Sequence, residues 1–229
     1  SRRAGGVQDA YATLDADPKN PMLNRAISER YAPGSTFKVL TAIALIENGI
    51  ANPDTRMDSP VSTTLPGTNT EVSNIESSTC GDGKPTLTEA FARSCNTTFV
   101  LASEKLTTQQ LTDVTKRFGF GHEQEIPLTV IPSVFPSDAD SAQLAMSSIG
   151  QYTVQATPMQ MAQVAQTIAN GGQMMSPYLI KQIVDADNQT IRKTKATEAG
   201  RPISADTASK VTGMMQAVVS QPSGSGTPM

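Results

Sequence analysis

The longest apolar run of the 229-residue chain lies between residues 35 and 48. Six aliphatic side chains leave it almost no polar face: Val39, Leu40, Ala42, Ile43, Leu45 and Ile46. A helix that is apolar nearly all round is typical of a deeply buried element. Pro33 and Gly34 precede the run as a sharp turn, and Gly49 follows it as a C-terminal cap. The pattern therefore predicts a buried helix over 35–48.

Shorter segments of helical periodicity follow along the chain. The predicted helices start near Thr86 or Thr88 and then cover 96–105, 107–119, 157–171 and 204–220. The 157–171 segment has clear end signals, because Thr157 can cap it, Pro158 takes the first helical position and Gly171 follows the last turn. Residues 177–191 alternate as in a strand or hairpin, and 51–74 are expected to form loops with short strands. The pattern predicts a helix-dominated chain with few strands.

Composition and charge narrow the classes of protein. The chain has 18 Lys and Arg residues and 21 Asp and Glu residues, which gives a net charge of −3. No basic stretch is interleaved with aromatic residues. Nucleic-acid binding needs a positive footprint, so the sequence predicts none. No apolar run approaches a membrane span and no signal peptide is visible. A membrane anchor, if the protein has one, is expected outside this chain.

The two cysteines, Cys80 and Cys95, leave two interpretations open. With a single histidine in the chain, they cannot build a closed zinc site without carboxylates, and their spacing fits no zinc-finger pattern. They are either buried free thiols or a disulfide that closes a short loop in an oxidising compartment. The residues themselves therefore indicate no closed zinc site.

The candidate chemistry begins where the 35–48 helix starts. Ser35 and Lys38 form an S-x-x-K pair, and residues three apart on a helix lie on the same face. Desolvation and the positive end of the helix dipole both lower the pKa of a lysine placed there. A neutral lysine can take the proton of the serine, and the Ser35 N–H can donate to an oxyanion. By itself S-x-x-K is a weak motif, and the plain alternative is a capping serine followed by a solvated lysine.

A second motif changes that balance. Ser94, Cys95 and Asn96 form an S-x-N triplet at the C-terminal part of a predicted helix. A second hydroxyl can relay protons, and an asparagine amide can hold a substrate amide and a lysine at once. The structural alternative is a polar turn or a break between helices. Because an amine at the mouth of a buried helix is not on a solvated face, the combination favours a catalytic pair.

The combination of S-x-x-K with S-x-N resembles the penicillin-recognising serine enzymes. Longer stretches sharpen the match: NRAISERYAPGSTFKVLTAIALIENG, LTEAFARSCNTTFV, FGFG and SSIGQYTVQATPMQMAQVAQTIANGG all look like the transpeptidase domain of class B penicillin-binding proteins. The cysteines near and within the S-x-N block resemble an actinobacterial branch of that family. The resemblance covers residues 9–229. It implies an α+β fold, with a helical subdomain and a central antiparallel sheet covered by helices.

The resemblance also implies a role for each matching residue. Ser35 is the expected nucleophile toward the D-Ala-D-Ala carbonyl of a peptidoglycan stem peptide, and Lys38 is its general base. Ser94 is expected to relay protons and Asn96 to bind the substrate amide. The family forms an acyl-enzyme that the amine of another stem peptide resolves into a cross-link, and β-lactams acylate the same serine.

The family context extends to compartment and partners. Because the family works outside the cytoplasmic membrane, a Cys80–Cys95 disulfide becomes the favoured interpretation. The expected location is the cell envelope, on the extracytoplasmic face of the plasma membrane. Stem peptides, β-lactams and proteins of cell-wall synthesis or division are the expected partners, with no cofactor.

The sequence departs from the family pattern in two places. The third motif, K-T-G or K-S-G, occurs nowhere. We therefore expect the 9–229 domain to lack its K-T-G strand region and to have incomplete sheet strands. The segment 1–8 is expected to be a loop, either a linker or the remnant of an upstream segment.

Other functions stay open on the same fold. A D,D-carboxypeptidase or a β-lactamase would use the same serine. A β-lactam sensor or a catalytically degenerate cell-wall scaffold would keep the shape without turnover. Outside the motifs, His122 is expected in a surface turn, Glu89 in a salt bridge or cap, and Tyr152 in packing or near the cleft.

Overall fold

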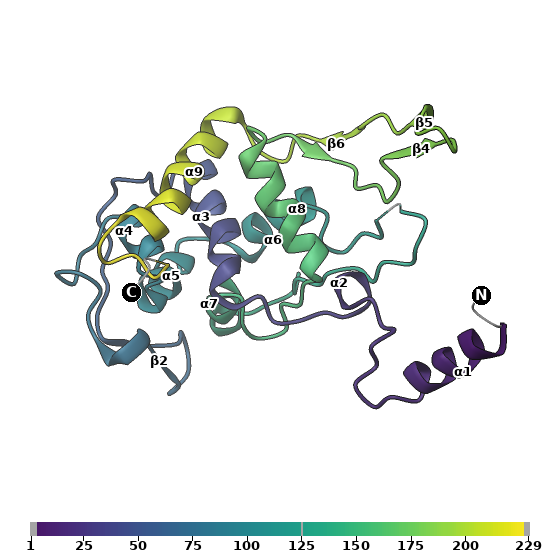
Figure 1. Cartoon of the computed structure of the whole chain (residues 1–229). Helices are drawn as coiled ribbons and strands as arrows, with labels where there is room; N and C mark the ends of the chain where they lie inside the picture. Colours follow the sequence, from purple (N-terminus) through teal and green to yellow (C-terminus); the bar gives the residue numbers. More distant parts are fainter. Residues whose placement is uncertain (1–3, 125, 227–229) are drawn as a thin grey trace.

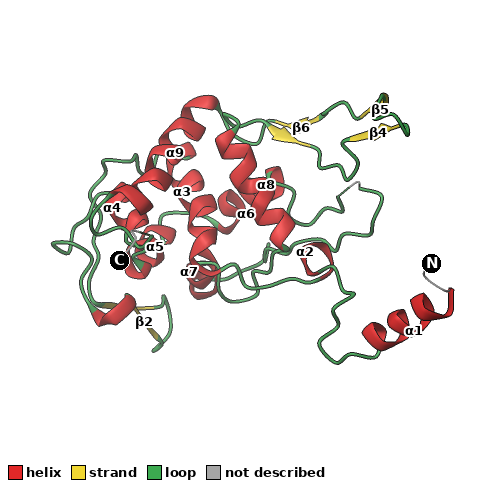
Figure 2. Cartoon of the chain, viewed as in Figure 1, coloured by secondary structure: helices red, strands yellow, loops and turns green. Residues whose placement is uncertain are grey.

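The structure, a computed structural model, describes residues 4–124 and 126–226. Helices dominate it, and most of them pack into one body, whereas the N-terminal helix lies apart from that body (Figure 1, Figure 2). The helices are α1 Ala4–Asp15, α2 Arg25–Ser28, α3 Lys38–Glu47, α4 Leu87–Ala92, α5 Asn96–Ser103, α6 Thr108–Arg117, α7 Ser141–Ser148, α8 Pro158–Ala169 and α9 Ala205–Ser220. Two 3₁₀ turns, η1 Gly34–Phe37 and η2 Ile75–Ser77, stand among them.

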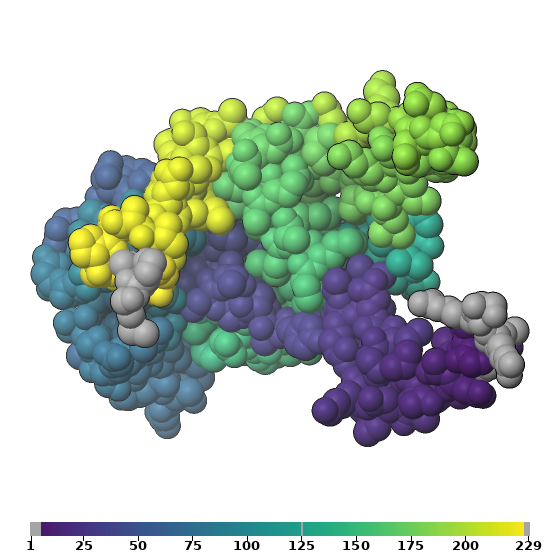
Figure 3. All heavy atoms as spheres, in the orientation of Figure 1, coloured from purple at the N-terminus to yellow at the C-terminus, as the bar shows by residue number. Residues whose placement is uncertain are grey.

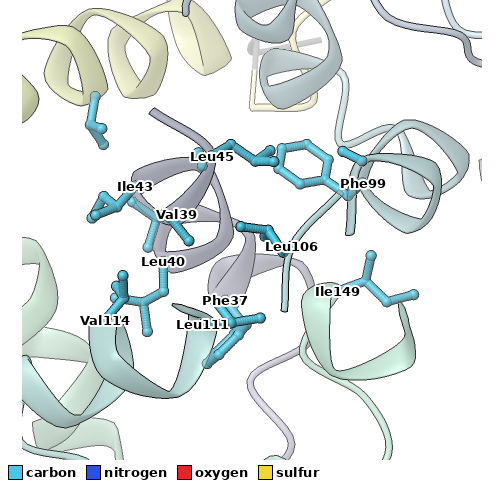
Figure 4. Close-up of a cluster of buried hydrophobic side chains, with 14 of the residues drawn as sticks. Phe37, Val39, Leu40, Ile43, Leu45, Phe99, Leu106, Leu111, Val114 and Ile149 are labelled. Carbon is cyan, nitrogen blue, oxygen red and sulfur yellow. The ribbon is translucent and has the colours of Figure 1, made fainter. Parts of the chain in front are cut away.

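Helix α3 is the centre of the body. Every residue from Lys38 to Leu45 is buried. Helices α5, α6 and α9 all pack against α3, and Figure 4 shows the side chains that meet around it, among them Leu40, Ile43 and Phe99. Full burial of one such side chain contributes about 1.5–3 kcal/mol. The apolar run that predicts this helix therefore also explains why the other helices gather on it.

The strands form three separate antiparallel pairs. They are β1 Ser62–Thr64 with β2 Glu71–Ser73, β3 Met174–Met175 with β6 Glu198–Gly200, and β4 Gln182–Val184 with β5 Thr190–Lys193. The hairpin predicted over 177–191 is confirmed as the β4–β5 pair, which projects from the body in Figure 1 and Figure 3. No pair joins another within the described residues, so this part of the chain is as strand-poor as the sequence predicts.

Most predicted helices are confirmed, and their caps explain their bounds. Thr107 caps α6 and Thr157 caps α8, and both accept a hydrogen bond from the backbone N–H three residues on. The Glu89 carboxylate accepts a hydrogen bond from the N–H of Thr86, so the capping role predicted for Glu89 is confirmed. Helix α7, for which the sequence pattern gave no assignment, starts with a similar capping box at Asp140.

The expectation of a loop over 1–8 is wrong for Ala4–Gln8, which form the first turns of α1. Residues 1–3 lie outside the described residues. The helix has no basic or acidic dipole partner at either end. Its exposed apolar side chains, Val7, Tyr11 and Leu14, are spaced as on one helical face. That spacing is the signal that the polar composition of residues 1–24 obscured.

Two helix boundaries also differ from expectation near the motifs. The predicted 35–48 helix begins with the 3₁₀ turn η1, and α-helical geometry starts only at Lys38. The S-x-N triplet does not continue a helix, because α4 ends at Ala92 and α5 begins at Asn96. Ser94 between them has a positive φ of 60°, which breaks the helix. No helix of the described residues has the length and apolarity that a membrane crossing requires.

Candidate active site

Ser35 lies in the η1 turn, one turn before the buried part of α3. In a 3₁₀ turn, side chains three residues apart are nearly eclipsed, so Ser35 and Lys38 point the same way. Ser35 is exposed, whereas Lys38 is only 1% exposed. Their polar atoms, Oγ and Nζ, are 3.2 Å apart. The sequence places an accessible hydroxyl beside a buried amine.

The Lys38 amine also connects the two motifs. Its Nζ lies 2.7 Å from the Ser94 carbonyl oxygen, 2.8 Å from Asn96 Oδ1 and 3.1 Å from Ser94 Oγ. The carbonyl and amide oxygens can only accept hydrogen bonds. A neutral amine has two N–H groups for these two acceptors, which leaves its one lone pair to accept the proton of a neighbouring serine hydroxyl. This arrangement suits an amine that takes a proton from a serine.

The electrostatics of the site agree with a neutral amine. Burial lowers the pKa of Lys38 to about 7, from the usual value near 10.5. None of the ion pairs among residues 4–124 and 126–226 involves Lys38, so no carboxylate offsets the desolvation. The Phe99 ring, whose centroid is 5.6 Å from Nζ, forms part of the apolar wall. The sequence predicted a lowered pKa, and burial is the cause that the structure identifies.

A close contact between two glycines shapes the turn that presents Ser35. The Gly34 N–H donates to the Gly150 carbonyl at 3.0 Å. Both glycines have left-handed backbones, with φ of 55° and 71°. A Cβ on Gly150 would lie 2.1 Å from the Gly34 carbonyl oxygen. Gly150 therefore supports the turn that carries Ser35, a role that sequence reasoning missed although the residue lies within the quoted SSIGQ stretch.

Three of the four motif residues open onto a groove of about 460 Å³. Ser35, Lys38 and Ser94 line it on one side, and apolar side chains of α8 and α9 line the other, including Val164, Ile168, Met215 and Val218. Three residues weighed from the sequence are absent from its lining: His122 lies in an exposed turn, Glu89 caps α4, and Tyr152 is exposed with a positive φ. No cluster of His, Cys, Asp and Glu suited to a metal occurs in the described part of the chain.

Cys80 and Cys95 form a disulfide in the structure, with a Cα–Cα distance of 6.0 Å. Cys95 is the residue between Ser94 and Asn96, and it is also the N-cap of α5. The bond therefore ties the S-x-N triplet to the loop that follows η2.

Loss of this disulfide is expected to destabilise the protein. The bond links residues 15 apart in the sequence. Closing a loop of that size stabilises a fold by about 3 kcal/mol through the unfolded state. We expect the double variant Cys80→Ser/Cys95→Ser to lose about that much unfolding free energy in urea titrations. Reduced wild type should match it, and an unchanged urea midpoint would contradict the prediction.

An exposed serine, a buried amine without an anionic partner and an S-x-N triplet together define the site of the penicillin-recognising serine proteins. The family model of the penicillin binding protein transpeptidase domain matches residues 3–228. The chain belongs to this family, and the resemblance and the fold class that the sequence predicts are confirmed.

Two mycobacterial proteins are similar to this chain over most of its length. Peptidoglycan D,D-transpeptidase PbpA of Mycolicibacterium smegmatis is 44% identical over 212 residues, which are 91% of this chain and 43% of that protein. PbpA of Mycobacterium tuberculosis is 39% identical over 209 residues, 90% of this chain and 42% of its own length. The chain thus spans less than half the length of these curated relatives.

Solved structures agree with the sequence relatives. Penicillin-binding protein A from M. tuberculosis, as an imipenem acyl-enzyme complex, superimposes with a TM-score of 0.86 at 36% identity, over 95% of this chain and 50% of that one. Its penicillin G acyl-enzyme complex gives a TM-score of 0.85 over 97% of this chain and 52% of that one. These solved proteins carry β-lactams as acyl-enzymes.

Proposed function

We propose that this chain carries the acylation machinery of a peptidoglycan D,D-transpeptidase. The observation that carries the proposal is the Lys38 amine, which is buried, has no anionic partner and lies 3.2 Å from an exposed serine hydroxyl. Relatives that share 39–44% of the sequence are named as transpeptidases of this kind. The same site accounts for β-lactam binding, because the structural neighbours hold these drugs as acyl-enzymes.

The first chemical step transfers the Ser35 proton to the Lys38 lone pair. Ser35 Oγ then forms a bond to the carbonyl carbon of the D-Ala-D-Ala amide. The C–N bond breaks, and the leaving amine of D-Ala takes a proton that Ser94 Oγ relays from Lys38. Asn96 holds the lysine through its Oδ1 and can bind the substrate amide. The amine of a second stem peptide then displaces Ser35 from the acyl-enzyme, which forms the cross-link.

The groove beside Ser35 leaves one wall open for the rest of the site. We propose that a K-T-G strand, carried by the full-length protein, completes that wall and adds contacts to the substrate carboxylate. The known relatives are more than twice the length of the matched region. Full-length protein is therefore the material for every activity measurement.

The cellular setting is part of the same proposal. The relatives act on peptidoglycan, which belongs to the cell envelope. We place the domain on the extracytoplasmic face of the plasma membrane, held by an anchor outside the described residues, because a disulfide persists in an oxidising compartment. Proteins of cell-wall synthesis or division are the proposed partners.

Covalent trapping of benzylpenicillin tests the function. Intact mass spectrometry of the full-length protein should show one stable adduct, which peptide mapping places on Ser35. Ser35→Ala should show none, whereas Ser141→Ala, a substitution of an exposed serine on α7, should keep it. Rapid loss of the adduct with penicillin turnover would indicate a β-lactamase. No adduct on folded wild type would leave a scaffold without acylation chemistry.

A further inference from the structure

Helix α5 carries Asn96 at its first position, and its N-terminus lacks a cap of its own. The N-cap residue is Cys95, which makes no side-chain capping bond because its sulfur is in the disulfide. The first N–H groups of a helix need acceptors from elsewhere. The acceptor for Thr97 N–H is the Asn74 Oδ1, at 3.0 Å, although the two residues are 23 positions apart.

Asn74 is a buried residue whose side chain hydrogen-bonds to three stretches of the chain. Its side-chain amide Nδ2 donates to the Pro60 carbonyl at 3.0 Å and to the Ser78 carbonyl at 3.1 Å. Its Oδ1 accepts from Thr97 N–H and also from Thr97 Oγ1, at 3.2 Å. The residue is 7% exposed. Every polar atom of this side chain therefore has a partner, as expected where a buried amide fixes the positions of its neighbours.

The contacts lead from Asn74 to the catalytic pair in two short steps. Ser73, the preceding residue and the last of β2, accepts a hydrogen bond from Asn96 Nδ2 at 3.0 Å. The other end of that same amide, Asn96 Oδ1, accepts from Lys38 Nζ at 2.8 Å. Asn74 thus holds both the strand end that orients the Asn96 amide and the helix turn from which Asn96 projects. In Figure 1, β2 and α5 lie on the same side of the body.

We propose that Asn74 is a positioning residue for the Ser35–Lys38 pair, acting through the Ser73 carbonyl, the first turn of α5 and the Asn96 amide. This inference rests on the proposed acylation chemistry. The strands around Ser73 give it limited support, because β1 and β2 pair only with each other and have no fully buried residue, although both contact α5 and Val72 packs against the core. A two-stranded pair is marginally stable in water. The buried amide of Asn74 adds hydrogen bonds that fix the end of this pair against α5.

The hydrogen bonds of Asn74 are expected to keep the general base, Lys38, in a fixed position. Lys38 Nζ must stay within hydrogen-bond reach of Ser35 Oγ, and a displacement near 1 Å can cost about a hundredfold in rate. If Asn74 is truncated, Asn96 loses its fixed acceptor at Ser73 and Lys38 gains freedom and water. Water around the amine opposes the desolvation that lowers its pKa, so the pH at which it loses its proton should rise.

The test is the pH profile of acylation by a fluorescent penicillin on full-length protein. Asn74→Ala is expected to lower the second-order acylation rate about tenfold or more and to move its rising limb to higher pH. Gln160→Ala is the matched control. Gln160 is also a buried amide, on α8, and its Nε2 donates to the Phe118 carbonyl at 2.6 Å; in the described structure it makes no hydrogen bond to the four motif residues. Gln160→Ala should keep the wild-type acylation rate and the wild-type rise of that rate with pH, although both variants lose thermal stability.

The outcomes separate this inference from the proposed function. Absence of acylation in wild type would remove the function itself, and the inference with it. If folded Asn74→Ala keeps the wild-type acylation rate and the wild-type pH profile, the positioning role alone is overturned. Equal losses of acylation rate in Asn74→Ala and Gln160→Ala would overturn it as well. Should Asn74→Ala not fold, Asn74→Asp replaces it. This variant keeps the acceptor for Thr97 N–H but loses both donor bonds, so we expect a loss of about threefold in the same direction.

Discussion

Replacing Lys38 by methionine is expected to slow the acylation of Ser35 about a thousandfold. Methionine has a similar shape and suits the apolar wall near Phe99, but it cannot accept the Ser35 proton. The amine is the only nitrogen or carboxylate base among the residues that line the groove in the described structure. The second-order rate with a fluorescent penicillin, measured on the full-length protein, checks the prediction.

The pKa of Lys38 also predicts the direction in which the acylation rate changes with pH. With a pKa lowered by burial to about 7, Lys38 is protonated below pH 7 and cannot act as a base. The wild-type rate should therefore rise with pH and level off above about 7, and the residual rate of Lys38→Met should lack this limb. Lys105→Met, at an exposed lysine beyond the groove, should behave as wild type. A Lys38→Met rate within tenfold of wild type, with the limb intact, would mean that another group is the base.

Adding one methyl group at Gly150 is expected to impair both stability and acylation. The Cβ of Gly150→Ala would lie 2.1 Å from the Gly34 carbonyl oxygen and 2.8 Å from both Gly34 N and Phe37 Cβ. Because two of these atoms are backbone, the η1 turn itself must move. We expect the unfolding free energy to fall by about 3 kcal/mol, and the acylation rate to fall about a hundredfold as Ser35 shifts away from Lys38.

A second glycine separates the two causes of this effect. Gly49, which follows α3, has a φ of 67°, close to the 71° of Gly150, but nothing lies within 4 Å of its Cβ position. Gly49→Ala therefore measures the cost of a left-handed alanine alone, about 1 kcal/mol, and should leave acylation unchanged. Urea unfolding and penicillin acylation of both variants provide the comparison. Equal effects of the two substitutions would mean that the contact with Gly34 does not matter for the nucleophile.

Local signals account for what the sequence predicted correctly. The spacing of apolar side chains in α3, and the caps Thr107 and Thr157, are fixed by neighbours within about one helical turn. The S-x-x-K spacing also survives the change from an α-helical to a 3₁₀ turn, because residues three apart share a side in both. Helix α1 is the exception to these correct predictions. Its apolar side chains lie on one face, but they do not pack against the core.

Contacts across long separations account for what the sequence did not predict. Ser94 breaks the helix with a positive φ, and its carbonyl meets Lys38 across 56 positions of the chain. Gly150 supports Gly34, and Asn74 caps α5, from other segments of the chain. A carbonyl or an amide oxygen has no periodicity, so no pattern along the chain reveals which donor it meets.

The sequence by itself therefore determined the chemistry: an S-x-x-K pair at the mouth of a buried helix, an S-x-N triplet and the family to which they belong. Periodicity and spacing encode which face of an element is apolar and which side chains share it. Only the tertiary structure decided how that chemistry is held. The packing of distant segments around α3 excludes water from Lys38, which lowers its pKa, and brings the Ser94 carbonyl and the Asn96 amide to the positions that orient it.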